Sequence, residues 1–347
     1  MKILEVALPG RPIYPEDKME YFNLQHGAIE ILISLLARGF VEEGHFCDVY
    51  SFGNSPLSES PFAKLSGGGL TVDWYLFNQR LLQYIQFSPI KYDVIHIHAI
   101  ATAVELKWSQ IKIPIVYTWH DPPTITWGNE RQFDVLRKVA DKYKTNIQFV
   151  AISNFQRDKL ELNIPVVHNG LDIEQYSWDK KKSDRYLSVG RIVHDKGHDI
   201  AVDVAFRSGI KLDLIGNLYD RSYFDAYIKP RLCDRIVYHG PIYGLRKKLF
   251  FETCKGFLNT LRWEEPFGLT LVEALACGTP VIGFANGSVK EVVGNCGIFV
   301  SSAVDLREML RSQKIPRISP QRCRERAEMF SYKRMVKEYL KIFTSVA

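Results

Sequence analysis

The sequence predicts an α/β fold made of two Rossmann-like domains, each a doubly wound parallel sheet. Strand-like apolar runs alternate with amphipathic, helix-like runs, which is the pattern of parallel sheets wrapped by helices. The alternation runs through two consecutive series, and 347 residues are enough for two domains. With 46% hydrophobic and 24% charged residues, the composition is that of a globular protein with sizeable cores. Two such domains predict a central cleft, with ligands at the carboxyl ends of the strands.

The first series begins at the N-terminus with an apolar run that one acidic residue interrupts. Apolar runs predict strands at 2–8, 46–52, 93–98, 114–120 and 148–153. Amphipathic runs predict helices at 27–38, 74–86 and 154–162. We expect the first helix to end near Gly39, because glycine commonly terminates a helix. No Gly-x-Gly-x-x-Gly follows the first strand, which disfavours a nicotinamide dehydrogenase.

A charged stretch at 179–185 precedes the second series and predicts a surface linker. Apolar runs then predict strands at 186–189, 212–215, 236–239, 256–260 and 280–284, with a shorter one at 298–300. Helices are predicted at 197–207, 223–230, 244–252, 268–276, 289–293, 305–311, 320–329 and 332–343.

Composition narrows the classes of function. The six cysteines are scattered without metal-ligand spacing, so we expect reduced core thiols and no structural metal. No apolar run approaches the roughly 18 residues that a spanning helix needs, which predicts a cytoplasmic protein or one peripheral to a membrane. Lys and Arg number 16 against 18 Asp and Glu in residues 1–170, but 29 against 21 in residues 171–347. A basic second half suits a polyphosphate, nucleic acid or an anionic membrane, and also a solvated helical face.

The stretch from Trp263 to Val281 is the strongest candidate for ligand binding. A helix is predicted to begin near Gly268, and its first turn offers free backbone N–H groups and the positive end of the helix dipole. Glu265 stands before that turn and Glu273 lies within the helix. The arrangement suits a ligand that is anionic in the middle and hydroxylated at both ends, although glutamates near a helix start are often simply solvated.

A second loop supplies cations. Gly190-Arg191 and Lys196-Gly197 lie between the first strand of the second domain and the following helix. A forked guanidinium and a compact ammonium there can clamp a diphosphate and neutralise the charge that builds on it as a bond breaks. Surface ion pairs are the alternative for each residue taken alone.

Three histidines and a serine in the first domain are further candidates. His120 ends a strand and is predicted to face the cleft. His96 and His98 point the same way on an earlier strand, where metal binding lacks a third ligand, and His98 is the candidate for lining the cleft. Ser153 also ends a strand, but the stronger prediction is that it caps the next helix.

These motifs together resemble glycosyltransferase family 4, a family of retaining, sugar-nucleotide-dependent transferases with the GT-B fold. The resemblance is carried by Gly190-Arg191 with Lys196-Gly197 and by Glu265-Pro-Phe-Gly268 with Glu273-Ala-Leu-Ala. Other matching segments extend it over most of the chain: Gly44-His45, His168-Asn169-Gly170-Leu171-Asp172, Leu214-Ile215-Gly216, Tyr238-His239-Gly240, Gly278-x-Pro280-Val, and Gly287 with Glu291.

The resemblance implies roles for the candidate residues. Arg191 and Lys196 would hold the donor diphosphate, Glu273 would accept from the ribose, and Glu265 and His120 would contact the donor sugar. Further donor contacts would come from the backbone at Gly190, Phe267, Gly268, Leu269 and Thr270, with the base near Gly240, Pro241 and Ile242. The family's Gly-Gly loop matches Gly27-Ala28, where a side chain replaces a hydrogen and the close approach of the donor is altered.

The resemblance also implies an organisation and a reaction. Residues 1–170, joined by a C-terminal helix at about 330–347, would form the acceptor-side domain, and 171–329 the nucleotide-sugar domain. The predicted function is transfer of a sugar, with retention and without a metal or other cofactor, from a nucleoside-diphosphate sugar (a UDP-sugar) to a hydroxyl acceptor. The alternatives are a catalytically weak nucleotide-sugar binding protein and a GT-B epimerase or hydrolase. No nucleic-acid partner is expected, and peripheral membrane association has only weak support.

Overall fold

The computed structural model describes residues 1–7, 28–51, 64–67, 74–99, 111–122, 126–127, 130–143 and 147–347. The chain divides into two compact units. The first comprises Met1–Gly170 together with Tyr332–Ala347, and the second comprises Leu171–Ser331. Gly27 lies outside the described residues, so the prediction made for it stays a prediction.

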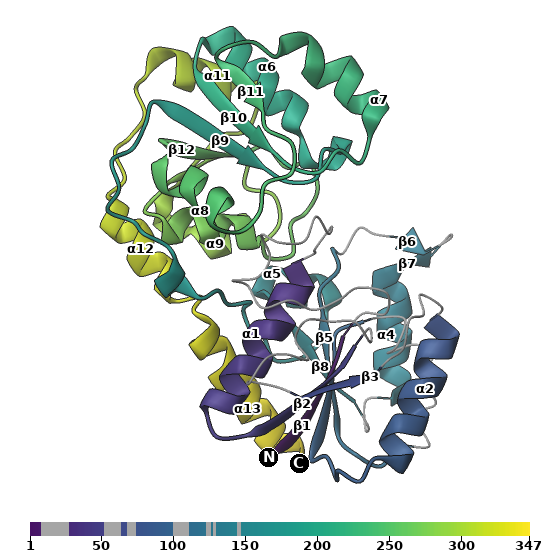
Figure 1. Cartoon of the computed structure of the whole chain (residues 1–347). Helices are drawn as coiled ribbons and strands as arrows, with labels where there is room; N and C mark the ends of the chain where they lie inside the picture. The colour runs from purple at the N-terminus through teal and green to yellow at the C-terminus, as the bar shows by residue number, and fades with distance from the viewer. Residues whose placement is uncertain are drawn as a thin grey trace. The chain divides into compact units, whose positions relative to one another are not determined.

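The first unit is built on a parallel sheet of six strands in the order β3-β2-β1-β4-β5-β8 (Figure 1). Most of the described strand side chains are fully buried, because helices cover both faces of a doubly wound sheet. The short β3 was not predicted, since its sequence lies in a Ser-, Pro- and Gly-rich stretch. The strands are β1 (Lys2–Val6), β2 (Phe46–Ser51), β3 (Lys64–Gly67), β4 (Val94–Ile97), β5 (Ile115–Trp119) and β8 (Ile147–Ala151).

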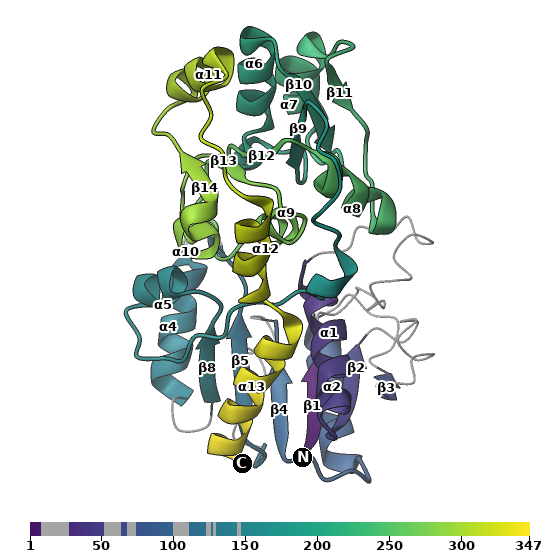
Figure 2. The same ribbon diagram turned by 90° about the vertical axis from the view of Figure 1, so that its left-hand side faces the viewer.

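Helices from distant parts of the sequence cover this sheet. The last helix, α13, packs beside α1 (Figure 2), and Phe343 of α13 meets Phe40 of α1 with ring centroids 5.5 Å apart. The amphipathic helix α4 and the small hairpin of β6 and β7 were missed from the sequence. The helices of this unit are α1 (Ala28–Glu42), α2 (Trp74–Phe87), α4 (Gln132–Tyr143), α5 (Asn154–Leu160) and α13 (Tyr332–Val346), and the hairpin strands are β6 (Thr126–Trp127) and β7 (Glu130–Arg131).

The prediction that α1 ends near Gly39 is wrong. The helix continues to Glu42, and the glycine with positive φ is Gly44, at +82°. A Cβ on Gly39 would lie 2.4 Å from Cγ2 of Val336 on α13. Gly39 therefore serves close packing of two helices rather than helix termination, and a hydrogen bond of 2.7 Å from Tyr332 to Glu42 holds the same contact.

The second unit repeats the architecture, with strand order β11-β10-β9-β12-β13-β14 and every pairing parallel. The prediction of two doubly wound parallel sheets is thereby confirmed. Its strands are β9 (Arg185–Val189), β10 (Lys211–Ile215), β11 (Ile236–Tyr238), β12 (Gly256–Asn259), β13 (Val281–Gly283) and β14 (Gly297–Phe299). Its α-helices are α6 (His198–Ser208), α7 (Arg221–Tyr223), α8 (Gly244–Thr253), α9 (Leu269–Ala276), α10 (Val289–Val293), α11 (Ala303–Ser312) and α12 (Pro320–Glu328).

The charged stretch before β9 is mostly exposed, as predicted, but it does not link the two units. The second unit already begins at Leu171, and the ammonium of Lys182 is partly buried within it. This ammonium donates to the carbonyl oxygens of Glu252 and Cys277 at 2.9 and 2.7 Å, at the C-terminal ends of α8 and α9. A cation at these ends complements both helix dipoles.

The state of the cysteines and the absence of membrane-spanning helices were also predicted from the sequence. All six cysteines are free thiols, and five of them are buried, so reduced core thiols are confirmed except at the exposed Cys233. Among the described residues, no helix combines the length and the apolar character needed to cross a membrane.

Candidate functional site

The loop after β9 is held against the end of β12 by a glycine. Gly197 has a φ of +66°, and a Cβ there would lie 1.9 Å from the carbonyl oxygen of Thr260. The Thr260 hydroxyl in turn donates to the Gly197 carbonyl at 2.9 Å. Only glycine allows both the conformation and the approach, so the sequence at this position fixes where the loop bearing Arg191 and Lys196 lies.

An ion pair that the sequence did not reveal fixes the same loop. Arg262 donates from both terminal nitrogens to the two oxygens of Asp199, at 2.6 and 2.7 Å, and from one of them to the His194 carbonyl at 2.8 Å. Tyr223 donates to the same carboxylate. Burial alone would raise the pKa of Asp199, but the hydrogen bonds from Arg262 and Tyr223 outweigh it and lower the pKa. Both residues were missed because nothing in their local pattern shows that they meet.

Lys196 and Glu265, predicted separately, lie side by side. The Lys196 ammonium is 3.4 Å from Oε2 of Glu265 and 3.9 Å from the centre of the Trp263 ring. The Trp263 indole N–H donates to the same carboxylate oxygen at 3.0 Å. Burial lowers the pKa of Lys196, while Glu265 opposes the shift. Arg191 is exposed, with its guanidinium 5.5 Å from the centre of the Tyr219 ring.

Glu265 is positioned by the segment after β13. Its backbone forms a parallel bridge with Gly287, and its carbonyl accepts from the Ser288 N–H at 2.9 Å. Gly287 has a φ of +71°, and a Cβ there would lie 2.4 Å from the backbone nitrogen and oxygen of Glu265. The glycine after β13 therefore brings this loop directly against the Glu265 backbone.

The helix predicted near Gly268 is α9, which begins at Leu269. Gly268 precedes it with a φ of +86° and no side chain caps it, so the first N–H groups of the helix are not used by a capping side chain. Glu273, in the second turn, is buried. Its Oε1 lies 2.7 Å from the ammonium of Lys247 and accepts from Tyr176 at 3.2 Å. Lys247 was not among the sequence candidates, because it belongs to a different helix, α8.

The ends of β10 and β11 meet the loop after β9. The Gly216 N–H donates to the carbonyl of Gly240 at 3.0 Å, and a Cβ on Gly216 would lie 1.7 Å from the carbonyl oxygen of Gly190. Gly240 itself has a φ of +72°, and Pro241 and Ile242 follow it. Gly216 thus contacts both the segment predicted to bind the diphosphate and the segment predicted to bind the base, at the carboxyl ends of the strands.

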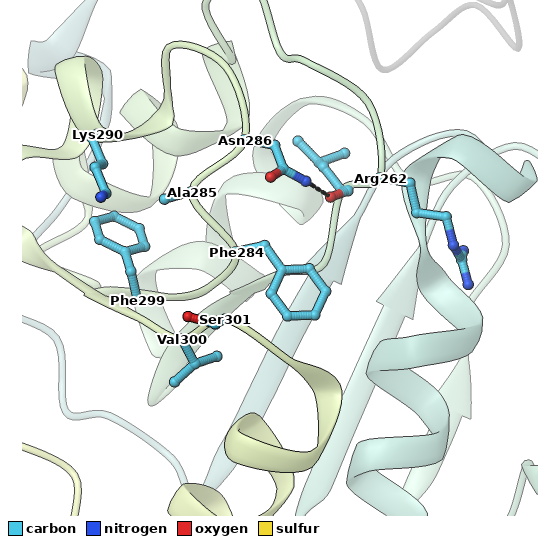
Figure 3. Close-up of a pocket in the computed structure, with 9 residues that line it drawn as sticks. Arg262, Phe284, Ala285, Asn286, Lys290, Phe299, Val300 and Ser301 are labelled. Carbon is cyan, nitrogen blue, oxygen red and sulfur yellow. Dashed lines mark hydrogen bonds between the residues drawn. The ribbon is translucent and has the colours of Figure 1, made fainter.

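A pocket of about 550 Å³ opens elsewhere on the second unit (Figure 3). It follows the carboxyl ends of β12, β13 and β14, whereas the diphosphate and base segments follow β9 and β11. Its lining contains none of the predicted donor-binding residues. Arg262, which borders it, points away from the two phenylalanines and is held by Asp199. The lining residues are Leu261, Arg262, Phe284, Ala285, Asn286, Lys290, Phe299, Val300 and Ser301.

In the first unit, Ser153 has the predicted capping role. It precedes α5 with extended backbone, and its hydroxyl accepts from the Gln156 N–H at 3.0 Å. Gly27 lies outside the described residues, and Ala28 is the first residue of α1. The Gly27-Ala28 departure from the family pattern therefore stays a prediction about donor fit.

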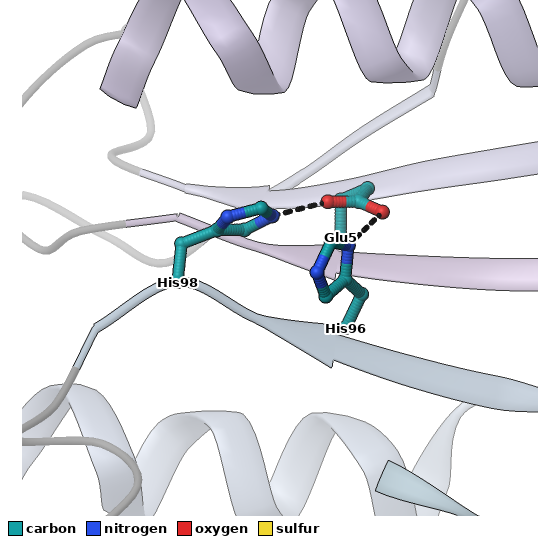
Figure 4. Close-up of side chains that lie close together, drawn as sticks. All are labelled: Glu5, His96 and His98. Carbon is teal, nitrogen blue, oxygen red and sulfur yellow. Dashed lines mark hydrogen bonds and ion pairs between the residues drawn. The ribbon is translucent and has the colours of Figure 1, made fainter. Parts of the chain in front are cut away.

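His96 and His98 form a buried cluster with Glu5, and His120 contacts this cluster. His98 Nδ1 lies 3.0 Å from His120 Nε2, and His98 Nε2 lies 2.7 Å from Glu5. His96 Nδ1 lies 2.9 Å from the other oxygen of Glu5 (Figure 4). The expectation that His96 and His98 lack a third ligand-type side chain is wrong, because Glu5 is that group. The signal in the sequence was an acidic residue inside an otherwise apolar strand.

Known protein families match most of the chain. Residues 29–175 match the family model described as Glycosyltransferase Family 4, and residues 172–328 match the one described as Glycosyl transferases group 1. An uncharacterized glycosyltransferase of Methanocaldococcus jannaschii is 23% identical over 316 residues, which are 77% of this chain and 79% of the relative.

Solved structures share the fold across nearly the full length. A sucrose-phosphate synthase from Thermosynechococcus elongatus has a TM-score of 0.79 at 17% identity, covering 99% of this chain and 98% of that one. An Anabaena protein in complex with UDP-glucose has a TM-score of 0.74 at 18% identity, covering 99% of this chain and all of that one (100%). Two doubly wound parallel sheets on this pattern define the GT-B class of glycosyltransferase. The two family models then place the chain more narrowly: it belongs to glycosyltransferase family 4 and is a sugar-transferring enzyme.

Proposed function

We propose that the enzyme transfers a sugar from a nucleoside diphosphate, with UDP as the nucleotide, to a hydroxyl acceptor with retention of the anomeric configuration. The observation that carries the proposal is the pairing of Lys196 with Glu265 beside the start of α9. In this pair, the Lys196 ammonium would hold the diphosphate and the Glu265 carboxylate would accept from a sugar hydroxyl. The Anabaena structure of the same fold, solved with UDP-glucose, supports the choice of UDP.

The diphosphate would be held by charge and by backbone N–H groups. Lys196 is partly buried, with 17% of its side chain exposed, so its charge is less screened than that of a surface lysine. Arg191, exposed on the same loop, supplies a second cation. The first N–H groups of α9 suit an anion, because they lie at the positive end of the helix dipole. As the bond to the sugar breaks, negative charge grows on the phosphate and these contacts strengthen.

The two glutamates would recognise the two ends of the donor. Glu273 accepts from the ribose hydroxyls, and the Lys247 ion pair orients this buried carboxylate. Glu265 accepts from a hydroxyl of the sugar, with its direction set by Trp263 and Lys196. From the first unit, His120 is proposed as a further contact of the sugar.

The chemical step we propose uses the leaving group as the base. The acceptor oxygen forms its bond to the anomeric carbon on the face that the diphosphate leaves, through a transition state with oxocarbenium character. The bond between the anomeric carbon and the phosphate oxygen breaks, and the departing diphosphate takes the proton of the acceptor hydroxyl. No carboxylate is assigned as a nucleophile, so the protein contributes positioning and electrostatic stabilisation.

The test begins with a thermal-stability screen of nucleotide sugars, because a ligand that binds the folded state raises the apparent stability. The stabilising donor is then incubated with and without a panel of hydroxyl acceptors, and the products are analysed by NMR. Transfer with an unchanged anomeric configuration is expected. An inverted product would refute retention, and stabilisation by non-uridine donors alone would refute UDP. An epimer as the main product would indicate an epimerase, and free sugar would indicate a hydrolase. Binding without any turnover would indicate a catalytically silent binding protein.

A further inference from the structure

Strand alternation gathers polar side chains on one face of the first sheet. Leu4 and Val6 of β1 pack into the apolar core formed with α2 and α4, so Glu5 between them points to the opposite face. The same alternation turns His96 and His98 away from that core, because Ile95 and Ile97 belong to it. Since β1 pairs with β4 and Glu5 is opposite His96 in the register, the carboxylate and the imidazoles meet (Figure 4).

Glu5 is a fully buried carboxylate whose two oxygens are each occupied by an imidazole. Oε1 lies 2.9 Å from His96 Nδ1, and Oε2 lies 2.7 Å from His98 Nε2. Burial would raise the pKa of Glu5, but the two imidazoles outweigh it and lower the pKa to about 2. The carboxylate is therefore ionised and can only accept, so each of these ring nitrogens must carry a proton.

The contacts of His98 show which of its ring nitrogens carries the proton. Burial, together with the neighbouring imidazole of His96, lowers the pKa of His98 to about 4, so His98 is neutral near pH 7. A neutral imidazole carries one proton, and Glu5 already receives it from Nε2. His98 Nδ1 must accept, and its partner at 3.0 Å is Nε2 of His120. The rings of His98 and His120 are nearly parallel, with centroids 5.3 Å apart.

We propose that Glu5 and His98 are positioning residues for His120, holding its proton on Nε2 and presenting its Nδ1 lone pair as a hydrogen-bond acceptor. The inference rests on the proposed function in taking His120 as a contact of the donor sugar. His120 directly follows β5 and is partly exposed, whereas Glu5 and His98 are buried and act only through it.

The other arm of the network anchors it without touching His120. His96 Nε2 lies 2.8 Å from the Thr118 hydroxyl, which lies 2.8 Å from the Tyr339 hydroxyl of α13. This arm ends at Tyr339 and leads away from His120, so its loss should leave the contact between His98 and His120 in place.

This orientation suits the charge that develops during transfer. A sugar hydroxyl that donates to Nδ1 becomes more acidic as the ring gains oxocarbenium character, so the hydrogen bond strengthens in the transition state. The negative charge of Glu5, transmitted through the His98 hydrogen bonds, makes the lone pair a better acceptor. With the opposite tautomer, an N–H would face the same hydroxyl and the gain would be lost.

The distances between the Glu5 oxygens and the imidazole nitrogens fit hydrogen bonds better than coordination of a metal ion. Two ligands of a tetrahedral zinc, each about 2.0–2.2 Å from the ion, lie roughly 3.3–3.5 Å apart. The two contacts between Glu5 and the imidazoles are 2.7 and 2.9 Å, which are hydrogen-bond lengths. Elemental analysis of the purified chain tests this choice, and a stoichiometric transition metal that His98→Gln removes would overturn the proposal.

The direct test is the tautomer of His120 in the full chain without ligand. Nitrogen NMR of histidine-labelled protein distinguishes the protonated from the unprotonated ring nitrogen, and the His120 signals are assigned with a His120→Gln variant. We expect Nε2–H in the wild type. His98→Gln places an amide N–H near the Nε2 position, toward Glu5, but no acceptor at the Nδ1 position that faces His120, so the single tautomer should be lost. His98→Asn, whose amide oxygen can replace Nδ1, should restore it. An Nδ1–H tautomer in the wild type, or no change in His98→Gln, would refute the proposal.

Kinetics with UDP-glucose as the probe gives the functional readout, measured as UDP release. His98→Gln should lower kcat by roughly 10- to 100-fold, the scale of losing an orienting partner behind a contacting residue, while KM changes little. His98→Asn should recover most of kcat. Tyr339→Phe breaks only the other arm, so it should keep both the tautomer and kcat. An equal loss in Tyr339→Phe and His98→Gln would mean a merely structural role. If the wild type does not turn over UDP-glucose, glucose is excluded as the donor sugar, and the NMR result still decides the positioning.

Discussion

Replacing Arg262 by alanine tests whether one ion pair fixes the loop that carries Arg191 and Lys196. The guanidinium makes two short hydrogen bonds to Asp199 and one to a backbone carbonyl. Hydrogen bonds to charged groups contribute about 1.5–3 kcal/mol each. The two side chains are 29% and 20% exposed, so screening reduces the sum. We therefore expect Arg262→Ala to destabilise the second unit by about 2–3 kcal/mol, less than a fully buried pair would cost.

The assay is native-state hydrogen exchange of the full chain, read by mass spectrometry on peptides from β9 and β12. It reports the opening free energy of the second unit without assuming that both units unfold together. Arg221→Ala is the matched control, because Arg221 pairs with Asp225 on an exposed helix surface and its loss should leave the exchange unchanged. A loss of less than about 0.5 kcal/mol in Arg262→Ala, the range of ordinary surface substitutions, would refute the reasoning.

The same pair predicts a pH dependence. The pKa of Asp199 is lowered in the folded state, so the ionised form is favoured by folding. Its contribution is fully present above the ordinary carboxyl pKa of about 3.9 and is lost as pH falls through the lower folded value. Wild type and Arg262→Ala should therefore differ most near neutral pH and converge in acid. A difference that grew on acidification would contradict the assignment.

Three further predictions concern packing and the donor. Gly39→Ala should destabilise the first unit by about 1–3 kcal/mol through overpacking, and Val336→Ala in the same chain should relieve part of that loss, measured by thermal unfolding. Glu273→Ala should weaken binding of free UDP in calorimetry, whereas Glu265→Ala should leave it largely intact and impair transfer; the reverse pattern would overturn both roles. Lys196→Ala should cost roughly 2–4 kcal/mol of transition-state stabilisation in kcat/KM, as when an oxyanion donor is removed, and near-normal turnover would exclude it from the diphosphate site.

Local pattern was enough to predict most of the fold. Except for β3, the strands of the two six-stranded sheets were predicted from their apolar runs, and the two series of alternating elements predicted two parallel sheets. The start of α9 could also be read locally, because Gly268 precedes an apolar run at helical spacing and Gly278 follows it. Such features depend on residues within a few turns of one another, which is the range that composition and periodicity report.

Contacts between segments that are far apart in the sequence could not be predicted from local patterns. Gly39 looked like a helix end, but its role depends on Val336, which lies about 300 residues later in the chain. Lys182 looked like part of a linker, but it satisfies carbonyl groups at the ends of two helices. One residue by itself does not indicate which distant segment it will contact. Gly39 was therefore interpreted as the end of a helix, and Lys182 as part of a linker.

The candidate site also combines features predicted from local sequence with contacts that only the tertiary structure shows. The sequence by itself placed Lys196, Glu265 and Glu273 in loops and in the helix after Gly268, and from that pattern we predict a phosphorylated ligand. The tertiary structure decided that Lys196 pairs with Glu265 and that Lys247 accompanies Glu273. It also decided that Glu5 meets His98, because alternation assigns each to a face of its strand but only the strand order makes β1 and β4 neighbours. The physical reason is that side-chain direction is local, whereas strand pairing is set by burial across the whole domain.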